Sequence, residues 1–341
     1  MFVSNSQSKT LEIAEFIGVK HPTDPHIKES IVMTTGFLIT VDFEGEKKDI
    51  VQTVKPSAEL LSQTLNQSYI FQNLIKECKY MTRQRKTDKA KLEEGRGTGH
   101  GIHYKPWIKV HEFGTCGRSH RHTGWKHQRV HQFLSDLEFY YFLLMQWEDS
   151  VVDIREQYPL LPLEQTILIA KDLGLLHQPK NSKEKIVLTT DFMLTVKTGT
   201  GTISVARTIK PDAHLNKPRT VEKFMIEQEF WKLKGIDWGI VTDAEIPKTM
   251  AKNIYSIYND YFWADESDYD ENDISRLVCD FKNALIKNSL DVIKTSIDFE
   301  QSYRWSEHSG LRFFKFLLAQ KYVGANFNEK FNFDTMKPIV G

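Results

Sequence analysis

The sequence lacks the features that mark secreted, disulfide-bonded and membrane proteins. Its three cysteines, Cys78, Cys116 and Cys279, lie far apart and form no CxxC pair. This spacing argues against a disulfide framework and a thiolate zinc site, and it fits a reducing compartment. No apolar run approaches the roughly 18 residues of a membrane span, and the first residues lack the basic-then-apolar order of a signal peptide. We therefore expect a cytoplasmic protein without membrane contact.

The sequence also lacks an excess of charge of either sign. It has 45 Lys and Arg against 45 Asp and Glu, so no global basicity points to a polyanionic partner. Positive charge is nevertheless concentrated in the segment CGRSHRHTGWKHQRVHQ at 116–132. This segment could contact DNA phosphates, or it could be a solvated loop with ordinary positive charge. The candidate phosphate-binding residues are Arg118, Arg121, Lys126 and Arg129.

A partial internal repeat distinguishes the chain. The two copies are IVMTTGF with TVKP at 31–37 and 53–56, and IVLTTDF with TIKP at 186–192 and 208–211. The second copy carries Asp191 and Lys210, whereas the first carries Gly36 and Lys55. Because glycine offers no ligand, only the second copy can hold a divalent cation at this position.

An Asp on one strand and a Lys on the next is the minimal arrangement of a metal-dependent nuclease site. Neighbouring strands lie about 4.8 Å apart, so Asp191 and Lys210 can meet at one end of a sheet. Mg²⁺, or Mn²⁺ in its place, would be held by hard oxygen ligands. The backbone carbonyl of Thr208 or Ile209 can complete the ligand shell. The alternative is an ordinary ion pair between a strand-end Asp and a nearby Lys.

The periodicity of apolar residues predicts alternating helices and strands, which is typical of an α/β fold. The predicted strands are 31–42, 48–55, 103–113, 151–160, 185–196 and 202–210, and 238–246 is predicted to be a strand that runs into a short helix. The predicted helices include segments within 131–147, 166–174 and 217–235. Ser135 or Asp136 could cap the first of these helices. Near the end of the chain, a helix followed by strand-like runs at 326–333 favours a winged-helix-like unit.

Several long segments, in matching order, resemble the TnsA family of endonuclease subunits of heteromeric bacterial transposases. They are GRGTGHGIHYKPWIKVHEF, GRSHR, SDLEFYYFLLMQWEDSVVDIREQYPLL, TTDF, ARTIKP, RTVEKFMIEQEFW and IDWGIVTDAEI. The resemblance is close over 92–258 and loose over 259–341. It implies a restriction-endonuclease-like core, a mixed sheet flanked by helices, with a catalytic trio of Glu, Asp and Lys. The implied trio is Glu138, Asp191 and Lys210, with Glu138 as the second metal ligand.

One position departs from the family pattern, because Thr208 stands where the family often has Gln.

The implied organisation is a degenerate repeat at 1–75, a charged linker at 76–91, a nuclease domain at 92–258, an acidic linker at 259–273 and a winged-helix-like domain at 274–341.

The family's activity would be cleavage of the 5′ strands at transposon ends in double-stranded DNA. The implied partners are a DDE transposase subunit, TnsB, and an ATPase regulator, TnsC. The alternatives are a free-standing restriction-type endonuclease and a non-catalytic DNA-binding or assembly subunit.

Overall fold

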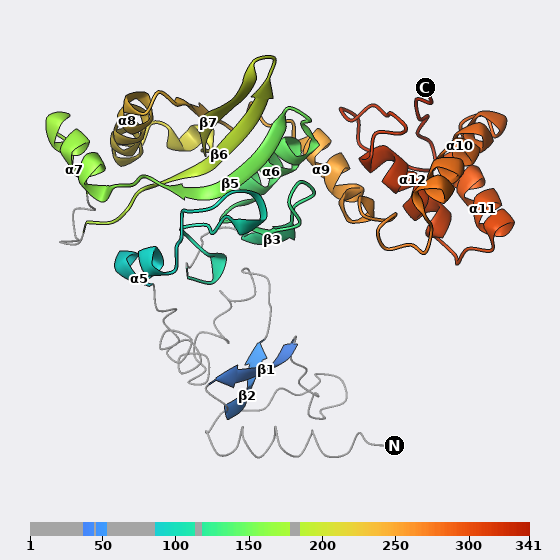
Figure 1. Cartoon of the computed structure of the whole chain (residues 1–341), viewed down its shortest axis with the longest axis horizontal. Coiled ribbons are helices and arrows are strands. Elements are labelled where there is room, and N and C mark those ends of the chain that lie inside the picture. The colour runs from blue at the N-terminus through green and yellow to red at the C-terminus, as the bar shows by residue number, and fades with distance from the viewer. Residues whose placement is uncertain (1–36, 44–45, 53–85, 113–117, 178–184) are drawn as a thin grey trace, which may run out of the picture. The chain divides into compact units, whose positions relative to one another are not determined.

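The computed structural model describes residues 37–43, 46–52, 86–112, 118–177 and 185–341, and for the first two ranges it describes the backbone alone (Figure 1). The chain divides into two compact units, Met1–Gln84 and Arg85–Gly341.

The described part of the first unit is an antiparallel hairpin. It consists of β1 (Phe37–Phe43) and β2 (Glu46–Gln52), with Phe37 opposite Gln52. In the second unit, the hairpin of the other repeat copy places Phe192 opposite Arg207. Phe192 follows Phe37 of the first copy by the same number of residues as Arg207 follows Gln52. The two hairpins of the repeat therefore have the same strand register. Gly36 and Lys55 lie outside the described residues.

The second unit is built around a mixed four-stranded sheet, which confirms the predicted α/β fold. The sheet has the order β5-β6-β7-β8, and these strands are Val151–Pro159, Thr189–Thr198, Gly201–Ile209 and Asp237–Val241. The first two pairings are antiparallel, and β7 pairs with β8 in parallel. A parallel pairing needs a crossover connection, which the chain makes through helix α8 (Pro218–Leu233).

Helices cover both faces of this sheet (Figure 1). Because successive strand side chains point to opposite faces, Phe192 and Leu194 join the core that contains helix α6 (Asp136–Trp147). Met193 packs instead with α8 and with α7 (Leu163–Asp172). The predicted helices and sheet strands therefore form within a few residues of their expected bounds.

One predicted strand does not form. Residues 101–112 contain 3-10 turns at Gly101–His103 and Val110–Glu112, and the described part of the strand expected at 103–113 is absent. Pro106 lacks the N–H that a ladder requires, and the next residue, Trp107, is buried and donates its amide to the Gln157 carbonyl. The remaining elements of this part are α5 (Asp88–Glu93) and the hairpin of β3 (His120–Thr123) and β4 (Val130–Phe133).

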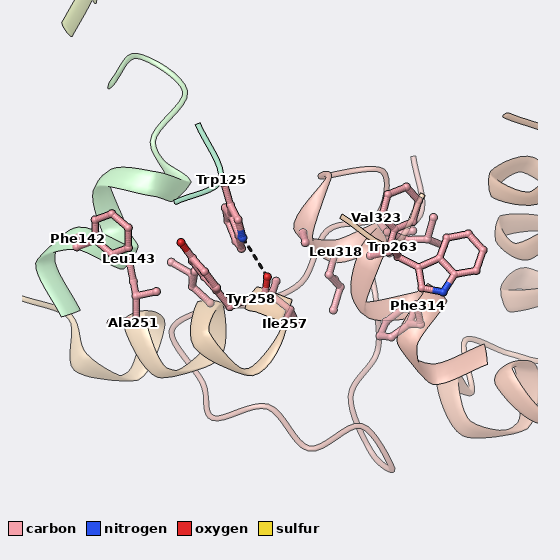
Figure 2. Close-up of a cluster of buried hydrophobic side chains, with 14 of the residues drawn as sticks. Trp125, Phe142, Leu143, Ala251, Ile257, Tyr258, Trp263, Phe314, Leu318 and Val323 are labelled. Atoms are coloured by element: carbon pink, nitrogen blue, oxygen red, sulfur yellow. Dashed lines mark hydrogen bonds between the residues drawn. The ribbon is translucent and has the colours of Figure 1, made fainter. Parts of the chain in front are cut away.

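The C-terminal part is helical and shares a continuous hydrophobic core with the sheet-bearing part. Its helices are α9 (Lys248–Ser256), α10 (Glu271–Lys287), α11 (Val292–Tyr303) and α12 (Ser309–Ala319), and a 3-10 turn covers Tyr258–Asp260. Figure 2 shows Trp125 donating its indole N–H to the Tyr258 carbonyl, at 3.0 Å, with Phe142 and Leu143 nearby. Among the described residues, none of the helices has both the length and the apolar character needed to cross a membrane.

The strand-like runs expected at 326–333 are absent from the described structure of this segment. Asn326 and Asn332 accept hydrogen bonds from the amides two residues later, at 3.1 and 3.0 Å, and so form Asx turns. A single antiparallel bridge joins Gly324 to Ile339.

Candidate functional site

Glu138 is fixed by the start of helix α6. Ser135, one of the two residues predicted to cap this helix, is the cap: its hydroxyl accepts the Glu138 amide at 3.2 Å and donates to Glu138 Oε1 at 3.0 Å. The amide of Leu134 donates to Glu138 Oε2 at 2.9 Å. This reciprocal pattern resembles a capping box. The carboxyl group is buried at the sheet-facing end of the helix.

Asp191 lies where strands β6 and β7 separate. The backbone ladder between them ends at the pair of Phe192 and Arg207. Beyond this pair the acceptor is a side chain and not a backbone carbonyl: Asp191 Oδ2 accepts a hydrogen bond from the Ile209 amide at 2.8 Å. The carboxyl group is thereby held against the end of β7.

Lys210 follows directly after β7. Its backbone amide donates to the Val241 carbonyl at 3.0 Å, which anchors this position to the neighbouring strand β8. Burial raises the pKa of both Glu138 and Asp191, and the positive charge of the half-buried Lys210 side chain opposes this rise at each carboxyl. The structure thus brings together all three members of the predicted trio.

The two carboxyl groups carry more potential negative charge than Lys210 offsets. Burial, and then the charge of Asp191, raise the pKa of Glu138 to about 8. Burial also raises the pKa of Asp191, although the Ile209 amide and Lys210 oppose this. Paired carboxyl oxygens with a deficit of positive charge fit a divalent cation. Within the described ranges, no group of three or more His, Cys, Asp or Glu side chains is arranged to hold a metal ion, but Mg²⁺ is commonly held by only one or two carboxylates.

The raised pKa of Glu138 predicts a pH-dependent cost to folding. Between its ordinary pKa of 4.5 and the folded value of about 8, the folded state keeps a proton that the unfolded state releases. The free energy of unfolding should therefore fall as pH rises through this window, by up to about 1.4 kcal/mol per pH unit. We expect Glu138→Gln to flatten this slope, and to be more stable than wild type at pH 8 in EDTA.

Urea unfolding at pH 5 and pH 8 measures this effect. Glu164→Gln is the matched control, because Glu164 is exposed on α7. Equal pH slopes for wild type and Glu138→Gln would show that Glu138 ionises in the folded protein as an ordinary carboxyl does.

Two further polar residues border the trio, and neither was predicted from the sequence. Gln157 on β5 is buried and donates from Nε2 to Glu138 Oε2 at 3.2 Å. Glu227 on α8 is also buried, and burial raises its pKa to about 7, helped by the charge of Asp191. No spacing rule links either residue to the TTD and TIKP segments.

Glu227 also binds the hydroxyl of Thr208, the residue that departs from the family pattern. The Thr208 hydroxyl donates to Glu227 Oε1 at 2.6 Å and accepts from the Trp238 indole at 3.2 Å. The side chain is therefore engaged on the α8 side of the sheet. The sequence offered two Thr208 groups as metal ligands, the hydroxyl and the backbone carbonyl. The hydroxyl is engaged in these hydrogen bonds, which leaves the backbone carbonyl as the candidate ligand.

The predicted basic segment forms the β3–β4 hairpin, and its members have different surroundings. Arg118 and Arg121 are exposed. Lys126 is half-buried and donates to the Glu148 carbonyl at 2.9 Å, and burial lowers its pKa. The side chains available to a phosphate backbone are thus those of Arg118 and Arg121.

Arg129 departs from the predicted phosphate-binding role. Its guanidinium is buried and bound to Glu156 through two hydrogen bonds of 2.8 and 2.7 Å. His131 Nδ1 lies 2.8 Å from the same carboxylate. Burial raises the pKa of Glu156, but its partners His131 and Arg129 lower it to about 2. Arg129 therefore ties β4 to β5 inside the fold, and its charge is not available to DNA.

Burial lowers the pKa of His131 itself, which favours the uncharged ring. A charged ring would instead help to lower the pKa of Glu156. We favour an uncharged imidazole, because His131 Nε2 is buried without a hydrogen-bond partner. A protonated ring would leave a charged donor there unsatisfied. Arg129 is always charged, so its bidentate contact is enough to keep Glu156 ionised.

Comparisons with known proteins match most of the region around this site. A family model described as TnsA-like endonuclease N terminal matches residues 148–243, and one described as TnsA endonuclease C terminal matches residues 245–327. The first range includes Asp191 and Lys210. Glu138 lies before it, so its assignment depends on the geometry above.

A curated relative is also similar to this chain. It is the transposon Tn7 transposition protein TnsA of Escherichia coli, which is 44% identical over 169 residues. The match covers 50% of this chain and 61% of the relative, so the chain spans about three fifths of the relative's length.

Proposed function

This chain belongs to the TnsA endonuclease family, and on that premise we propose that it is a metal-dependent DNA endonuclease subunit of a transposase. It would cleave the 5′ strands at transposon ends in the cytoplasm. A DDE transposase subunit of the TnsB type would make the other cuts, and an ATPase of the TnsC type would regulate both. The observation that carries the proposal is the convergence of Glu138, Asp191 and Lys210 at one end of the sheet.

We propose that Glu138 and Asp191 hold Mg²⁺, with Mn²⁺ as a substitute, and that a backbone carbonyl of Thr208 or Ile209 contributes a further oxygen. The bound ion would neutralise charge on the scissile phosphate and lower the pKa of water. Ser135 keeps the Glu138 carboxyl in position, and the Ile209 amide does the same for Asp191. Lys210 would orient the attacking water and stabilise the negative charge that develops on the phosphate.

The exposed arginines of the β3–β4 hairpin would contact the DNA backbone. If Arg121 contacts one phosphate, Arg121→Ala should reduce the slope of log affinity against log salt by about 1, and weaken binding similarly for different sequences. Fluorescence anisotropy with duplex DNA in EDTA measures both. Lys287→Ala on α10 is the control, because Lys287 is an exposed cation in the C-terminal part. An unchanged slope for Arg121→Ala would remove the hairpin from the DNA interface.

The C-terminal residues 274–341 would form a winged-helix-like unit that docks the ATPase regulator. Three consecutive helices, α10 to α12, and the bridge between Gly324 and Ile339 support this proposal. The Asx turns within 326–334 replace the strand-like runs that the sequence predicted for the hairpin of this unit.

A strand-specific cleavage assay tests the proposed function. Transposon-end DNA labelled separately on each strand is incubated with the full chain, Mg²⁺ and the partner transposase. We expect 5′-strand cuts at the ends only when the partner is present. Cleavage of unrelated plasmid by the chain alone would favour a free-standing restriction-type enzyme. Absence of any 5′ cut from complete mixtures would favour a non-catalytic assembly subunit.

A further inference from the structure

Gln157 has an unusual backbone conformation for a strand residue. Its φ angle is +49°, although it lies within β5 and is not glycine. A left-handed conformation is unfavourable for a residue that carries a side chain. Such strain persists only where the surrounding structure enforces it, and it is concentrated at functional sites. The Trp107 amide donates to the Gln157 carbonyl at 3.2 Å and holds this conformation from outside the sheet.

The conformation places the Gln157 amide between the two candidate metal ligands. Glu156 pairs with Phe192 and Tyr158 pairs with Thr190, so Gln157 lies opposite Asp191 in the register. Its Nε2 donates to Glu138 Oε2 at 3.2 Å, and its side chain lies close enough to Asp191 to oppose the rise in the pKa of that carboxyl. One buried side chain on β5 therefore connects a carboxyl group on helix α6 with another on strand β6.

We propose that Gln157 is a positioning residue that holds Glu138 and Asp191 at the separation a divalent cation requires. This inference rests on the proposed nuclease function. A neutral amide suits the task, because it can donate to two carboxyl groups without adding a positive charge that would compete with the cation. Lys or Arg at the same place would neutralise the pair and weaken cation binding. The backbone strain is then the cost of directing this amide toward the ligands.

The test is the affinity of the full chain for Mn²⁺ alone, measured by isothermal titration calorimetry. Gln157→Asn keeps an amide and tolerates the left-handed backbone, but its shorter side chain cannot reach both carboxyl groups. Gln157→Gly removes the amide and relieves the strain, which keeps the fold accessible. We expect both variants to bind Mn²⁺ roughly tenfold to a hundredfold more weakly. The glycine variant should also be at least as resistant to urea as Gln157→Ala.

Gln128→Gly is the matched control. Gln128 also has a left-handed backbone, with φ of +43°, but it is exposed in the β3–β4 turn. This substitution should leave Mn²⁺ affinity unchanged. Wild-type affinity in Gln157→Asn and Gln157→Gly would overturn the positioning role.

Asp191→Asn, measured in parallel, distinguishes a failure of the Gln157 positioning role from a failure of the proposed metal site. Loss of Mn²⁺ binding in Asp191→Asn together with wild-type affinity in the Gln157 variants would overturn this inference alone. Wild-type Mn²⁺ affinity and cleavage in Asp191→Asn would overturn the metal site itself, and with it the positioning role of Gln157.

Discussion

Asp191→Asn is expected to lower the rate of 5′-strand cleavage by about a thousandfold or more. The substitution removes one negative charge from the candidate metal site and changes little else. Asparagine still offers an oxygen to the Ile209 amide, which Asp191 Oδ2 accepts at 2.8 Å. The loss would therefore reflect cation binding and charge, and the end of β7 would stay in place. Single-turnover cleavage of labelled transposon-end DNA, with partner transposase and Mg²⁺, measures it.

The control for this variant is Asp172→Asn, which changes an exposed carboxylate at the end of α7. It should cleave at the wild-type rate. Near-wild-type cleavage by Asp191→Asn would show that the phosphodiester chemistry takes place elsewhere on the chain.

Arg129→Ala should have the largest effect on stability, because it leaves Glu156 buried without its bidentate partner. Breaking a buried ion pair costs about 3–5 kcal/mol, which corresponds to a drop in Tm of roughly 10 °C for a unit of this size. Arg121→Ala, the exposed arginine of the same hairpin, should leave Tm nearly unchanged. Thermal unfolding followed by circular dichroism measures both variants.

The pH dependence of this loss has a definite sign. The pKa of Glu156 is lowered to about 2 in the folded protein, from an ordinary value of 4.5. Its contribution to stability is complete above pH 4.5 and is lost as pH falls through the folded value. The stability difference between wild type and Arg129→Ala should therefore shrink on acidification from pH 4.5 toward pH 2. A small and pH-independent difference would place Arg129 among ordinary surface charges.

The strands and helices around the site were predictable because local signals agree with the global fold. β6 and β7 follow from apolar runs separated by a glycine-containing turn, and Ser135 is a favoured residue at a helix start. The same signals failed at two places, where the backbone pairing that a strand needs is prevented or replaced. Pro106 prevents the strand expected at 103–113, and the Asx turns at Asn326 and Asn332 replace the strands expected near the C-terminus.

The candidate site was predictable only in part. Asp191 and Lys210 stand out because the two repeat copies differ at one and agree at the other. Glu138 came from family resemblance, since no spacing rule relates a helix start to a hairpin more than 50 residues later. Arg129 was misjudged because its charge is visible in the sequence, whereas its burial against Glu156 depends on how β4 meets β5.

Gln157 was missed for a different reason. The sequence around Gln157 contains no signal for a left-handed backbone within a strand. Gln is not a residue that favours that conformation. The contacts that enforce it, from Trp107, Glu138 and Asp191, come from three other segments of the chain. Only the assembled fold brings them together.

Anomalous diffraction from crystals soaked in Mn²⁺ tests the central claim most directly. If Glu138 and Asp191 hold the divalent cation, the anomalous map will contain a peak about 2.1 Å from a carboxyl oxygen of each residue, and Asp191→Asn will lose it. A map without a peak between these side chains, or with its strongest peak elsewhere on the chain, would contradict the account.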